Sequence, residues 1–414
     1  MASTAFNLSD GHRIRLLTGS GEMFPALVAT MDAARSEIRL ESYIFDFAGD
    51  GILVAEALMR AAQRGVMTCV LVDGVGTGVL PAPWPGRFLA AGVQWRVYSP
   101  LGPLGLLMPL RWRRLHRKLC VIDGREAFCG GINILDDFHD PGHGPQSLPR
   151  LDFAVQVQGA LVRHVQATVI HLWWRAQVLQ VLLRRRNRKP PFKTLKKTRQ
   201  SRLNWVRWPR IRVASVPQAG KGAALLLRDN VRHRHDIERA YLDAIGAARH
   251  EIVIANAYFL PGRKLRHALV EAARRGVRVR LLLQGRYEYF MQFHAARPVL
   301  GLLLAAGIEV HEYAAAFLHA KVAVIDADGD NPWATVGSSN LDPLSLLLAR
   351  EANIVVRDAA FAADLRARLD AVMSGKSTRL AASDDARRPW SQRLLDRVAL
   401  GLMRLALFLT GRDY

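Results

Sequence analysis

Cysteine is scarce in this sequence, and long hydrophobic runs are missing. The 414 residues include only three cysteines, Cys69, Cys120 and Cys129. Three irregularly spaced cysteines exclude a disulfide framework and a cysteine-based zinc site, and they favour a reducing compartment such as the cytosol. The first residues, MASTAFNLSDGHRIRLL, lack the apolar core of a signal peptide, and no run of about 18 apolar residues is free of charge. The sequence therefore predicts neither secretion nor a transmembrane span.

Acidic residues are few relative to basic ones. The chain has 36 Asp plus Glu against 58 Lys plus Arg, a formal net charge of +22. This excess predicts a polyanionic partner, for which nucleic acid and an anionic bilayer are the two candidates. Hydrophobic residues make up 50% of the chain, so it can bury the cores of two or three domains.

The chain consists of two copies of one unit, because four sequence blocks recur in the same order, roughly 203 to 215 residues apart. They pair as EIRLESYIF (37–45) with EIVIANAYF (251–259), AAQRGVMTCVLVDG (61–74) with AARRGVRVRLLLQG (272–285), FLAAGVQWRVY (88–98) with LLAAGIEVHEY (303–313), and HRKLCVID (116–123) with HAKVAVID (319–326). Helical periodicity alternates with short β-branched runs in each copy. We therefore expect an α/β fold of two homologous sandwich units, each with a largely parallel sheet between helices, paired about a pseudo-twofold axis.

The repeat divides the chain into four parts. We assign residues 1–174 to the first unit, 175–215 to a basic linker, 216–375 to the second unit and 376–414 to a C-terminal tail. The segment from Arg175 to Arg212 contains 14 Lys or Arg and no Asp or Glu. It suits either a solvated linker or a surface that contacts an anionic leaflet.

Two apolar segments are candidates for membrane contact. The segment 101–112, LGPLGLLMPLRW, precedes the motif described next, and it suits either a loop that dips into a bilayer or a loop buried against the second copy. The segment 391–412 has its leucines largely on one helical face. It suits either an interfacial amphipathic helix or an ordinary helix packed on the core.

The motif H-x-K-x4-D occurs once in each copy. It comprises His116, Lys118 and Asp123 in the first, and His319, Lys321 and Asp326 in the second. GGIN with Asn133 follows the first motif, and GSSN with Asn340 follows the second. On a strand the His and Lys share a face, whereas the Asp has the opposite parity. We therefore expect both aspartates to be scaffold residues at strand ends, with Asp123-Gly124 in a turn.

Pairing about a twofold axis predicts that two histidines, two lysines and two asparagines meet in one site. Fixed cations and neutral donors suit a phosphodiester whose charge grows as a nucleophile adds to phosphorus. One histidine can attack while the other protonates the leaving oxygen. A carboxylate is needed to orient each histidine, and the aligned strands DFAVQV and EANIVV supply Asp152 and Glu351. The arrangement requires no metal and no cofactor.

Two H-x-K-x4-D motifs, each followed by G-[GS]-x-N, resemble the phospholipase D superfamily. The blocks LESYIF, LLLRDN, AYFLP and GSSNLDP resemble its bacterial cardiolipin synthase branch, in the short form that lacks N-terminal transmembrane helices. The resemblance spans about residues 15–375. It implies two phospholipase D-like units and a phosphatidyltransferase that makes cardiolipin from phosphatidylglycerol through a phosphohistidine and releases glycerol.

The resemblance also implies residue roles. His116 becomes the nucleophile and His319 the general acid and base, while Asp123 and Asp326 complete the catalytic motif. The phosphate binders are Lys118, Lys321, Asn133 and Asn340, and the histidine orienters are Asp152 and Glu351. The enzyme would bind an anionic phospholipid membrane peripherally, at the cytoplasmic face of the inner membrane, without a nucleic-acid partner.

Departures from the family pattern and rival functions remain. Leu344 and Ala349 stand where many relatives have Arg and Asn, which affects the second-half scaffold and head-group preference. The same site could hydrolyse phospholipid or nucleic acid, and a catalytically inactive binding protein is a further alternative. The glycine-rich DGVGTG (73–78) is interpreted as a turn, and His233 and His235 as surface residues without a metal.

Overall fold

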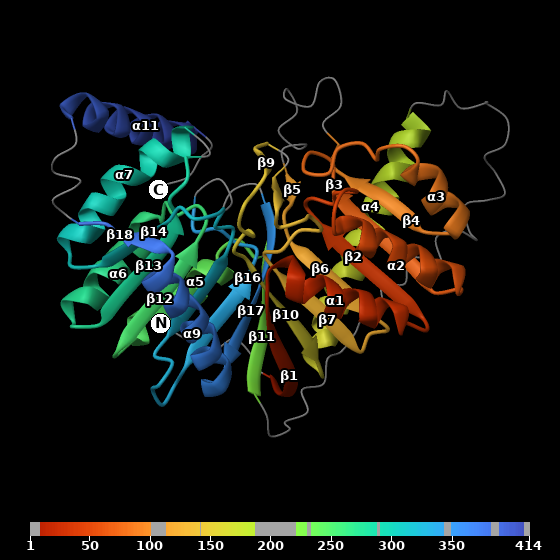
Figure 1. Cartoon of the computed structure of the whole chain (residues 1–414), viewed down its shortest axis with the longest axis horizontal. Coiled ribbons are helices and arrows are strands. Elements are labelled where there is room, and N and C mark those ends of the chain that lie inside the picture. Colours follow the sequence, from red (N-terminus) through yellow and green to blue (C-terminus); the bar gives the residue numbers. More distant parts are fainter. Residues whose placement is uncertain are drawn as a thin grey trace.

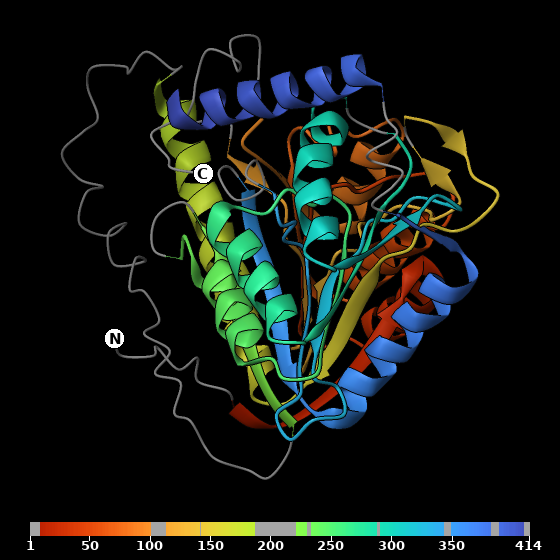
Figure 2. The same ribbon diagram turned by 90° about the vertical axis from the view of Figure 1, so that its left-hand side faces the viewer.

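The computed structural model describes residues 9–100, 113–140, 142–186, 221–229, 233–287, 290–342, 349–381 and 389–409. Within this part of the chain, one mixed sheet of sixteen strands runs through the molecule, and helices cover both of its faces (Figures 1 and 2). The apolar segment 101–112 and most of the basic linker lie outside the described residues. The predictions made for them therefore stay predictions.

The first unit contains ten strands and four helices among its described residues. In chain order they are β1 (Ser9–Thr18), α1 (Gly19–Asp32), β2 (Glu37–Ser42), α2 (Gly51–Gln63), β3 (Met67–Asp73), α3 (Trp84–Ala91), β4 (Gln94–Tyr98), β5 (Arg114–Leu115), β6 (Lys118–Ile122), β7 (Glu126–Gly130), β8 (His139–Asp140), β9 (Gly144–Pro145), β10 (Phe153–Gln158) and α4 (Leu161–Arg186).

The second unit and the tail repeat this pattern. Their described elements are β11 (Lys221–Arg228), α5 (Asp236–Ala247), β12 (Glu251–Asn256), α6 (Arg263–Arg274), β13 (Arg278–Gln284), α7 (Phe290–Ala305), β14 (Glu309–Tyr313), β15 (Lys321–Ile325), β16 (Trp333–Gly337), β17 (Ala349–Arg357), α9 (Ala359–Gly375), β18 (Ser377–Arg379) and α11 (Trp390–Leu409).

The strand order confirms two homologous α/β units related by a pseudo-twofold axis. From the centre outwards, the first unit runs β1-β10-β7-β6-β2-β3-β4, and the second runs β11-β17-β16-β15-β12-β13-β14 in the equivalent order. The two first strands, β1 and β11, pair antiparallel at the centre, as a twofold axis requires. The two sheets are thereby fused into one (Figure 1).

The expectation of a largely parallel sheet is wrong. Only β2-β3-β4, β12-β13-β14 and the short β5 beside β17 pair in parallel in the described sheet, and the other pairs are antiparallel. The physical reason is connection length. Helices link the parallel strands, whereas β6 and β7 are joined by a tight hairpin that cannot hold a crossover. Asp123 and Gly124 in that hairpin have φ of 52° and 62°, which suits the predicted turn.

The two units share one hydrophobic core. A single buried cluster includes Leu16 and Val155 from the first sheet together with Val324 and Ile354 from the second. The last helix of each unit reaches the other unit, because α4 contacts β11 and α9 contacts β1. The two copies are therefore one folded body.

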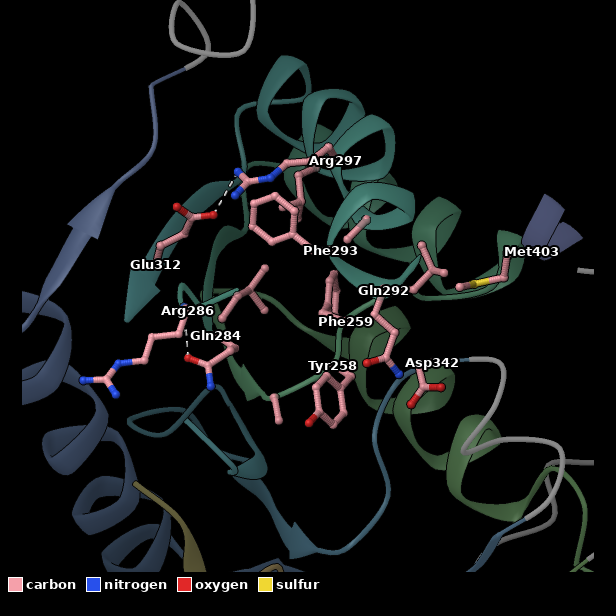
Figure 3. Close-up of a pocket in the computed structure, with 15 residues that line it drawn as sticks. Tyr258, Phe259, Gln284, Arg286, Gln292, Phe293, Arg297, Glu312, Asp342 and Met403 are labelled. Carbon is pink, nitrogen blue, oxygen red and sulfur yellow. Dashed lines mark hydrogen bonds and ion pairs between the residues drawn. The ribbon is translucent and has the colours of Figure 1, made fainter. Parts of the chain in front are cut away.

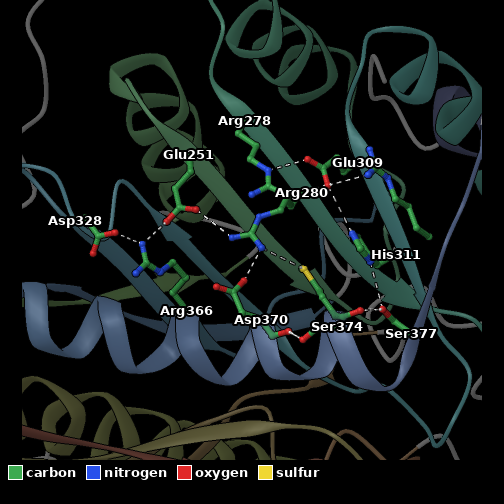
Figure 4. A network of polar contacts seen from close by, with 12 residues as sticks. Glu251, Arg278, Arg280, Glu309, His311, Asp328, Arg366, Asp370, Ser374 and Ser377 are labelled. Atoms are coloured by element: carbon green, nitrogen blue, oxygen red, sulfur yellow. Dashed lines mark hydrogen bonds and ion pairs between the residues drawn. The ribbon is translucent and has the colours of Figure 1, made fainter.

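Charged residues attach α9 to a face of the second sheet (Figure 4). Arg280 on β13 donates to Asp370 at 2.5 Å and to Glu251 at 3.0 Å. Arg366 on α9 donates to Glu251 at 3.0 Å and also binds Asp328. Because most of these groups are only partly exposed, the network fixes the helix on the sheet.

The boundaries of the predicted linker and tail differ from the structure. Helix α4 continues to Arg186, so the chain from residue 175 begins as part of a first-unit helix. Strand β18 pairs with β14, which adds residues 377–379 to the second sheet. Helix α11 packs on α7. Among the described residues, no helix combines the length and apolar character needed to cross a membrane.

Candidate active site

His116 and His319 lie at the edge of the fused sheet where β2 and β12 end. Each histidine comes two residues before the lysine that begins β6 or β15. The His116 amide donates to the carbonyl of Arg350 at 3.1 Å, and the His319 amide donates to the carbonyl of Leu151 at 2.8 Å. Each histidine is therefore held by a segment of the opposite unit, as the pseudo-twofold axis requires.

The predicted orienting carboxylates pair with the histidines across the two units. Nδ1 of His116 is 2.9 Å from Oε1 of Glu351, and Nδ1 of His319 is 2.6 Å from Oδ2 of Asp152. Both carboxylates are buried, with 0% and 1% exposure. Because Nδ1–H donates to the carboxylate, Nε2 of each ring is left to react.

Each carboxylate has a second donor that fixes its orientation. Ser338 Oγ donates to Oε2 of Glu351 at 2.5 Å, and the amide of Phe153 donates to Oδ1 of Asp152 at 2.8 Å. A Cβ at Gly131 would lie 2.3 Å from Oδ1 of Asp152. The second glycine of the GGIN block is therefore required by the close approach of the orienting carboxylate.

The two lysines are buried beside the histidines. Lys118 is 4% exposed and Lys321 0%. Nζ of Lys118 donates to the carbonyl of His116 at 2.7 Å, and Nζ of Lys321 donates to the carbonyl of His319. Burial, together with the charge of Lys321 and against the opposing charge of Glu351, lowers the pKa of Lys118 to about 7. Two buried cations in one place form a site for an anion.

The charges of the site act on one another. Burial lowers the pKa of His116, and the charges of Lys118 and Lys321 add to this effect while Glu351 opposes it. Burial lowers the pKa of His319 well below its usual value, with further lowering from the lysines and from His116. Burial raises the pKa of Asp152, which the two lysines oppose. This mutual influence indicates that the two halves form one site.

Asn133 and Asn340 are also buried, at 7% and 2% exposure. Oδ1 of Asn133 accepts from the amide of Ile44 at 3.1 Å, which leaves its NH₂ group as a donor. Both residues follow the short strand next to a histidine strand, so they lie at the same edge of the sheet.

Asp123 and Asp326 lie at the far ends of β6 and β15 and do not join the histidines. Asp123 accepts from the amides of residues 35–37 at 2.8 to 2.9 Å. Asp326 accepts from the amides of residues 249–251 over the same distances. Strand geometry places them about 15 Å from the lysines. This geometry agrees with the scaffold role inferred from strand parity and does not support a catalytic one.

The surroundings of the two histidines differ in a way that the paired motifs do not predict. The ring centroids of Tyr43 and His116 are 4.9 Å apart. Nζ of Lys118 lies 5.5 Å from the centroid of the Tyr43 ring. The repeat places Ala257 at the position of Tyr43. The aligned blocks already contained this signal, because tyrosine and alanine face each other in them.

A buried ion pair next to His116 has no counterpart at the equivalent positions of the second copy. Arg117 donates to the two carboxylate oxygens of Glu41 at 2.5 and 3.0 Å. The second copy has Ala320 and Ala255 at these places. Asp73 also accepts from the amide of Leu115 at 2.7 Å. Buried carboxylates therefore hold both neighbours of His116, through the backbone amide of Leu115 and the side chain of Arg117.

The remaining sequence candidates lie elsewhere. His233 and His235 are bonded to neighbouring acidic residues of their own helix start, at 2.6 and 3.3 Å. No group of three or more metal-ligating side chains is gathered in the described ranges. In DGVGTG, Asp73 accepts from the amide of Val75 at 2.8 Å, as in a turn.

A duplicated α/β unit with paired histidines and lysines at one edge defines a phospholipase D-like protein. The family model described as "Cardiolipin synthase, PLD-like domain" matches residues 27–137 and 241–373. Cardiolipin synthase B of Salmonella typhi is 38% identical over 382 residues, covering 92% of this chain and 85% of that protein. Cardiolipin synthase B of Escherichia coli K12 is 37% identical with the same coverage.

Solved structures give the same fold. Phosphatidylserine synthase of Haemophilus influenzae Rd KW20 matches with a TM-score of 0.67 at 12% identity, over 97% of this chain and 96% of that one. At this identity the match shows the fold alone. The sequence matches show more, and this chain belongs to the cardiolipin synthase family of phospholipase D-like enzymes.

Proposed function

We propose that this enzyme joins two phosphatidylglycerol molecules into cardiolipin and releases glycerol, through a phosphohistidine intermediate. Family membership supports the phosphatidyltransferase activity. The single observation that carries the mechanism is the crossed pairing of two buried histidine–carboxylate pairs beside two buried lysines. No residue of this mechanism requires a metal ion.

In the first half-reaction, Nε2 of His116 attacks the phosphorus of the donor lipid. The bond from phosphorus to the glycerol oxygen breaks, and His319 gives a proton to that oxygen. In the second half-reaction, His319 removes the proton from a hydroxyl of a second phosphatidylglycerol. That oxygen bonds to phosphorus, and the bond to His116 breaks.

The lysines and asparagines hold the phosphate oxygens during both steps. Lys118 and Lys321 supply positive charge where the transition state gains negative charge, in a site with little water. Asn133 and Asn340 supply neutral donors. Asp152 and Glu351 keep the proton on Nδ1 and stabilise the charged imidazole.

The assignment of His116 as the nucleophile is supported by the difference between the two sides. The Arg117–Glu41 pair, Asp73 and the Tyr43 ring restrict His116. A fixed ring suits attack on phosphorus, because a small misplacement of a reacting atom is costly. The repeat places Ala257 at the position of Tyr43 in the second unit, so no aromatic ring is expected there to restrict His319.

Peripheral attachment at the cytoplasmic face of the inner membrane is part of the proposal. Helix α11 turns Ala399, Leu400 and Met403 towards α7, whereas Leu394 and Leu402 are each 53% exposed. The outward face of α11 comprises the exposed Trp390, Leu394, Leu395, Val398, Leu402 and Leu405. Its exposed arginines suit an anionic bilayer, since apolar and basic groups together bind such surfaces.

The experiment that tests this function incubates purified protein with phosphatidylglycerol and identifies the products by mass spectrometry. We expect cardiolipin and glycerol in equal amounts. Phosphatidic acid as the main product would show a hydrolase instead. Cleavage of DNA without lipid turnover would favour the nucleic-acid phosphodiesterase that shares this site chemistry.

A further inference from the structure

A pocket lies in the second unit between the ends of β12, β13 and β14, helix α7 and helix α11 (Figure 3). Apolar side chains such as Phe259, Phe293 and Met403 form much of its wall. Gln284 and Gln292 enter it from β13 and α7 (Figure 3). None of these residues has a part in the mechanism given above.

The wall of the pocket is joined directly to the segments that carry the second-unit site residues. The amide of Ala257 donates to the carbonyl of Ala320 at 2.9 Å, and Ala320 lies between His319 and Lys321. The amide of Leu260 donates to the carbonyl of Leu341, the residue after Asn340, also at 2.9 Å. The pocket therefore adjoins the His319 side of the site.

The first unit differs from the second at one position of this wall. Tyr43 covers His116 at the repeat position of Ala257. Behind it, Phe45, Phe47 and Trp95 pack on one another with ring centroids 4.9 to 5.8 Å apart. Phe45 has an aromatic equivalent, Phe259, in the pocket wall. The contrast therefore rests on Tyr43, whose ring lies against His116 where the second unit has only the methyl group of Ala257.

The polar atoms of the pocket indicate a hydroxylated ligand. Nε2 of Gln284 is a buried donor and Oε1 of Gln292 a buried acceptor, and neither has a hydrogen-bond partner among the described residues. Buried polar atoms without partners are costly. A hydroxyl group can satisfy either atom, since it both donates and accepts.

The size of the pocket limits the ligand. It encloses about 70 Å³, and one water needs about 10–15 Å³ by this measure, so about five to seven water-sized groups fit. A glyceryl group, with three carbons and three oxygens, matches this space.

We propose that this pocket is the glyceryl site of the enzyme, a conclusion that rests on the function proposed above. The glyceryl group leaving the donor lipid occupies it first, and the glyceryl group of the acceptor then replaces it. Both groups exchange a proton with His319 on the side of phosphorus opposite His116. Gln284 and Gln292 bind hydroxyls that do not react.

The test measures acceptor preference with the full-length protein. The enzyme is incubated with phosphatidylglycerol in mixed micelles and with either deuterated glycerol or ethanol. The products, deuterated phosphatidylglycerol and phosphatidylethanol, are quantified. Gln284→Met and Gln292→Met remove one polar contact each at similar volume, and Ala257→Tyr copies the first unit. Gln63→Met, at an exposed position at the end of α2, is the matched control. Cardiolipin formation without added alcohol measures use of the lipid-borne glyceryl group.

We expect each glutamine variant to lower the ratio of glycerol to ethanol kcat/KM about three- to tenfold, the effect of one hydrogen bond. Ala257→Tyr should lower glycerol exchange and cardiolipin formation more than ethanol transfer. A loss of glycerol exchange alone would assign the pocket to free glycerol, and a loss of cardiolipin formation alone would assign it to the lipid-borne glyceryl group. Either result supports a glyceryl site.

If the glutamine variants have the same ratio of glycerol to ethanol kcat/KM as Gln63→Met, the proposal is overturned. Equal loss with both alcohols would overturn it too, because it would show general damage rather than recognition of glyceryl. If the unaltered protein transfers phosphatidyl to no acceptor, the proposed function itself fails, which is a distinct result.

Discussion

His116 and His319 are the residues on which the chemistry depends. We expect His116→Ala and His319→Ala each to reduce cardiolipin formation at least about 10³-fold, because each removes a nucleophile or a positioned acid and base. Turnover is measured with phosphatidylglycerol, and folding is checked by circular dichroism. His267→Ala on the surface of α6 is the control, since His267 is exposed. A variant of either site histidine that keeps a tenth of the activity would contradict its assigned role.

Lys118 predicts how activity depends on pH. Burial lowers the pKa of Lys118 from 10.5 to about 7, so in the free enzyme the cation is present below pH 7 and is lost as the pH rises above it. We expect kcat/KM to fall above about pH 7. In Lys118→Arg the charge persists, so the part of the alkaline fall that comes from Lys118 should move upwards even if the rate is lower. Loss of the His319 proton, whose pKa burial lowers well below 6.5, should lower kcat/KM equally in both enzymes.

A pH profile of kcat/KM that stays flat to pH 9 in the unaltered enzyme would remove Lys118 from phosphate binding. The fall of kcat/KM at low pH depends on His116 instead of Lys118. The pKa of His116 is lowered from 6.5, so its neutral, nucleophilic form persists below that pH.

Asp123 predicts a change in stability rather than in chemistry. Its carboxylate accepts several hydrogen bonds, which hold its pKa at about 2 instead of 3.8. The stabilisation is complete above pH 3.8 and is lost as the pH falls through 2. We expect Asp123→Asn to lower the free energy of unfolding by about 1–2 kcal/mol at pH 7, with the difference vanishing near pH 2.

Urea unfolding at several pH values measures the effect of Asp123→Asn. Asp50→Asn is a suitable control, because Asp50 is exposed and its side chain makes no capping hydrogen bond. The folded Asp123→Asn enzyme should keep most of its turnover. A large loss of kcat with unchanged stability would return Asp123 to the catalytic set.

At the scale of elements, much of the site could be predicted from the repeat and from strand parity. The repeat predicted two homologous units, which the equivalent strand orders confirm, and parity separated Lys118 from Asp123 along β6. Neither the repeat nor strand parity tells whether neighbouring strands run parallel or antiparallel. The antiparallel centre of the sheet was therefore not predicted. The partner of each carboxylate was also open, because the crossing of Asp152 and Glu351 depends on how the units dock.

Helix α11 predicts a loss of membrane binding that spares chemistry. We expect the triple variant Leu394→Ser, Val398→Ser and Leu402→Ser to weaken vesicle binding at least about tenfold, since burying one leucine side chain is worth about 1.5–3 kcal/mol. Stability should change little because these side chains are about half exposed. Turnover on detergent-solubilised lipid should persist.

Serine at the exposed Leu53 and Leu89, far from α11 along the chain, is the control for the α11 variant. Flotation with phosphatidylglycerol vesicles measures binding. Full flotation of the triple variant would remove α11 from the membrane surface, and the segments outside the described residues would become the candidates.

At the scale of the whole molecule, the duplication makes each half incomplete without the other. Each histidine takes its carboxylate and one backbone hydrogen bond from the opposite unit, and one core spans both. The symmetry is then broken at Tyr43 and Ala257, and at Arg117 and Ala320. The two histidines therefore differ in their surroundings although their carboxylate partners are equivalent.

The net charge of +22 predicts a binding pattern that separates lipid from nucleic acid. We expect the protein to float with anionic phosphatidylglycerol vesicles at 0.1 M salt more than with neutral vesicles, because each basic residue near an anionic surface contributes about 1 kcal/mol. At 1 M salt the screening length falls from about 10 to 3 Å. The electrostatic part of binding should then be lost while the apolar part from α11 persists.

Binding to DNA lacks the apolar part, so a gel-shift at low salt should disappear completely at 1 M. Vesicle binding that remains at 1 M salt but is absent in the α11 triple variant would show that the salt-resistant binding comes from the outward face of α11. Vesicle binding that vanishes with salt as DNA binding does would show that charge alone attracts the enzyme. The outward face of α11 would then have no part in presenting the site to lipid.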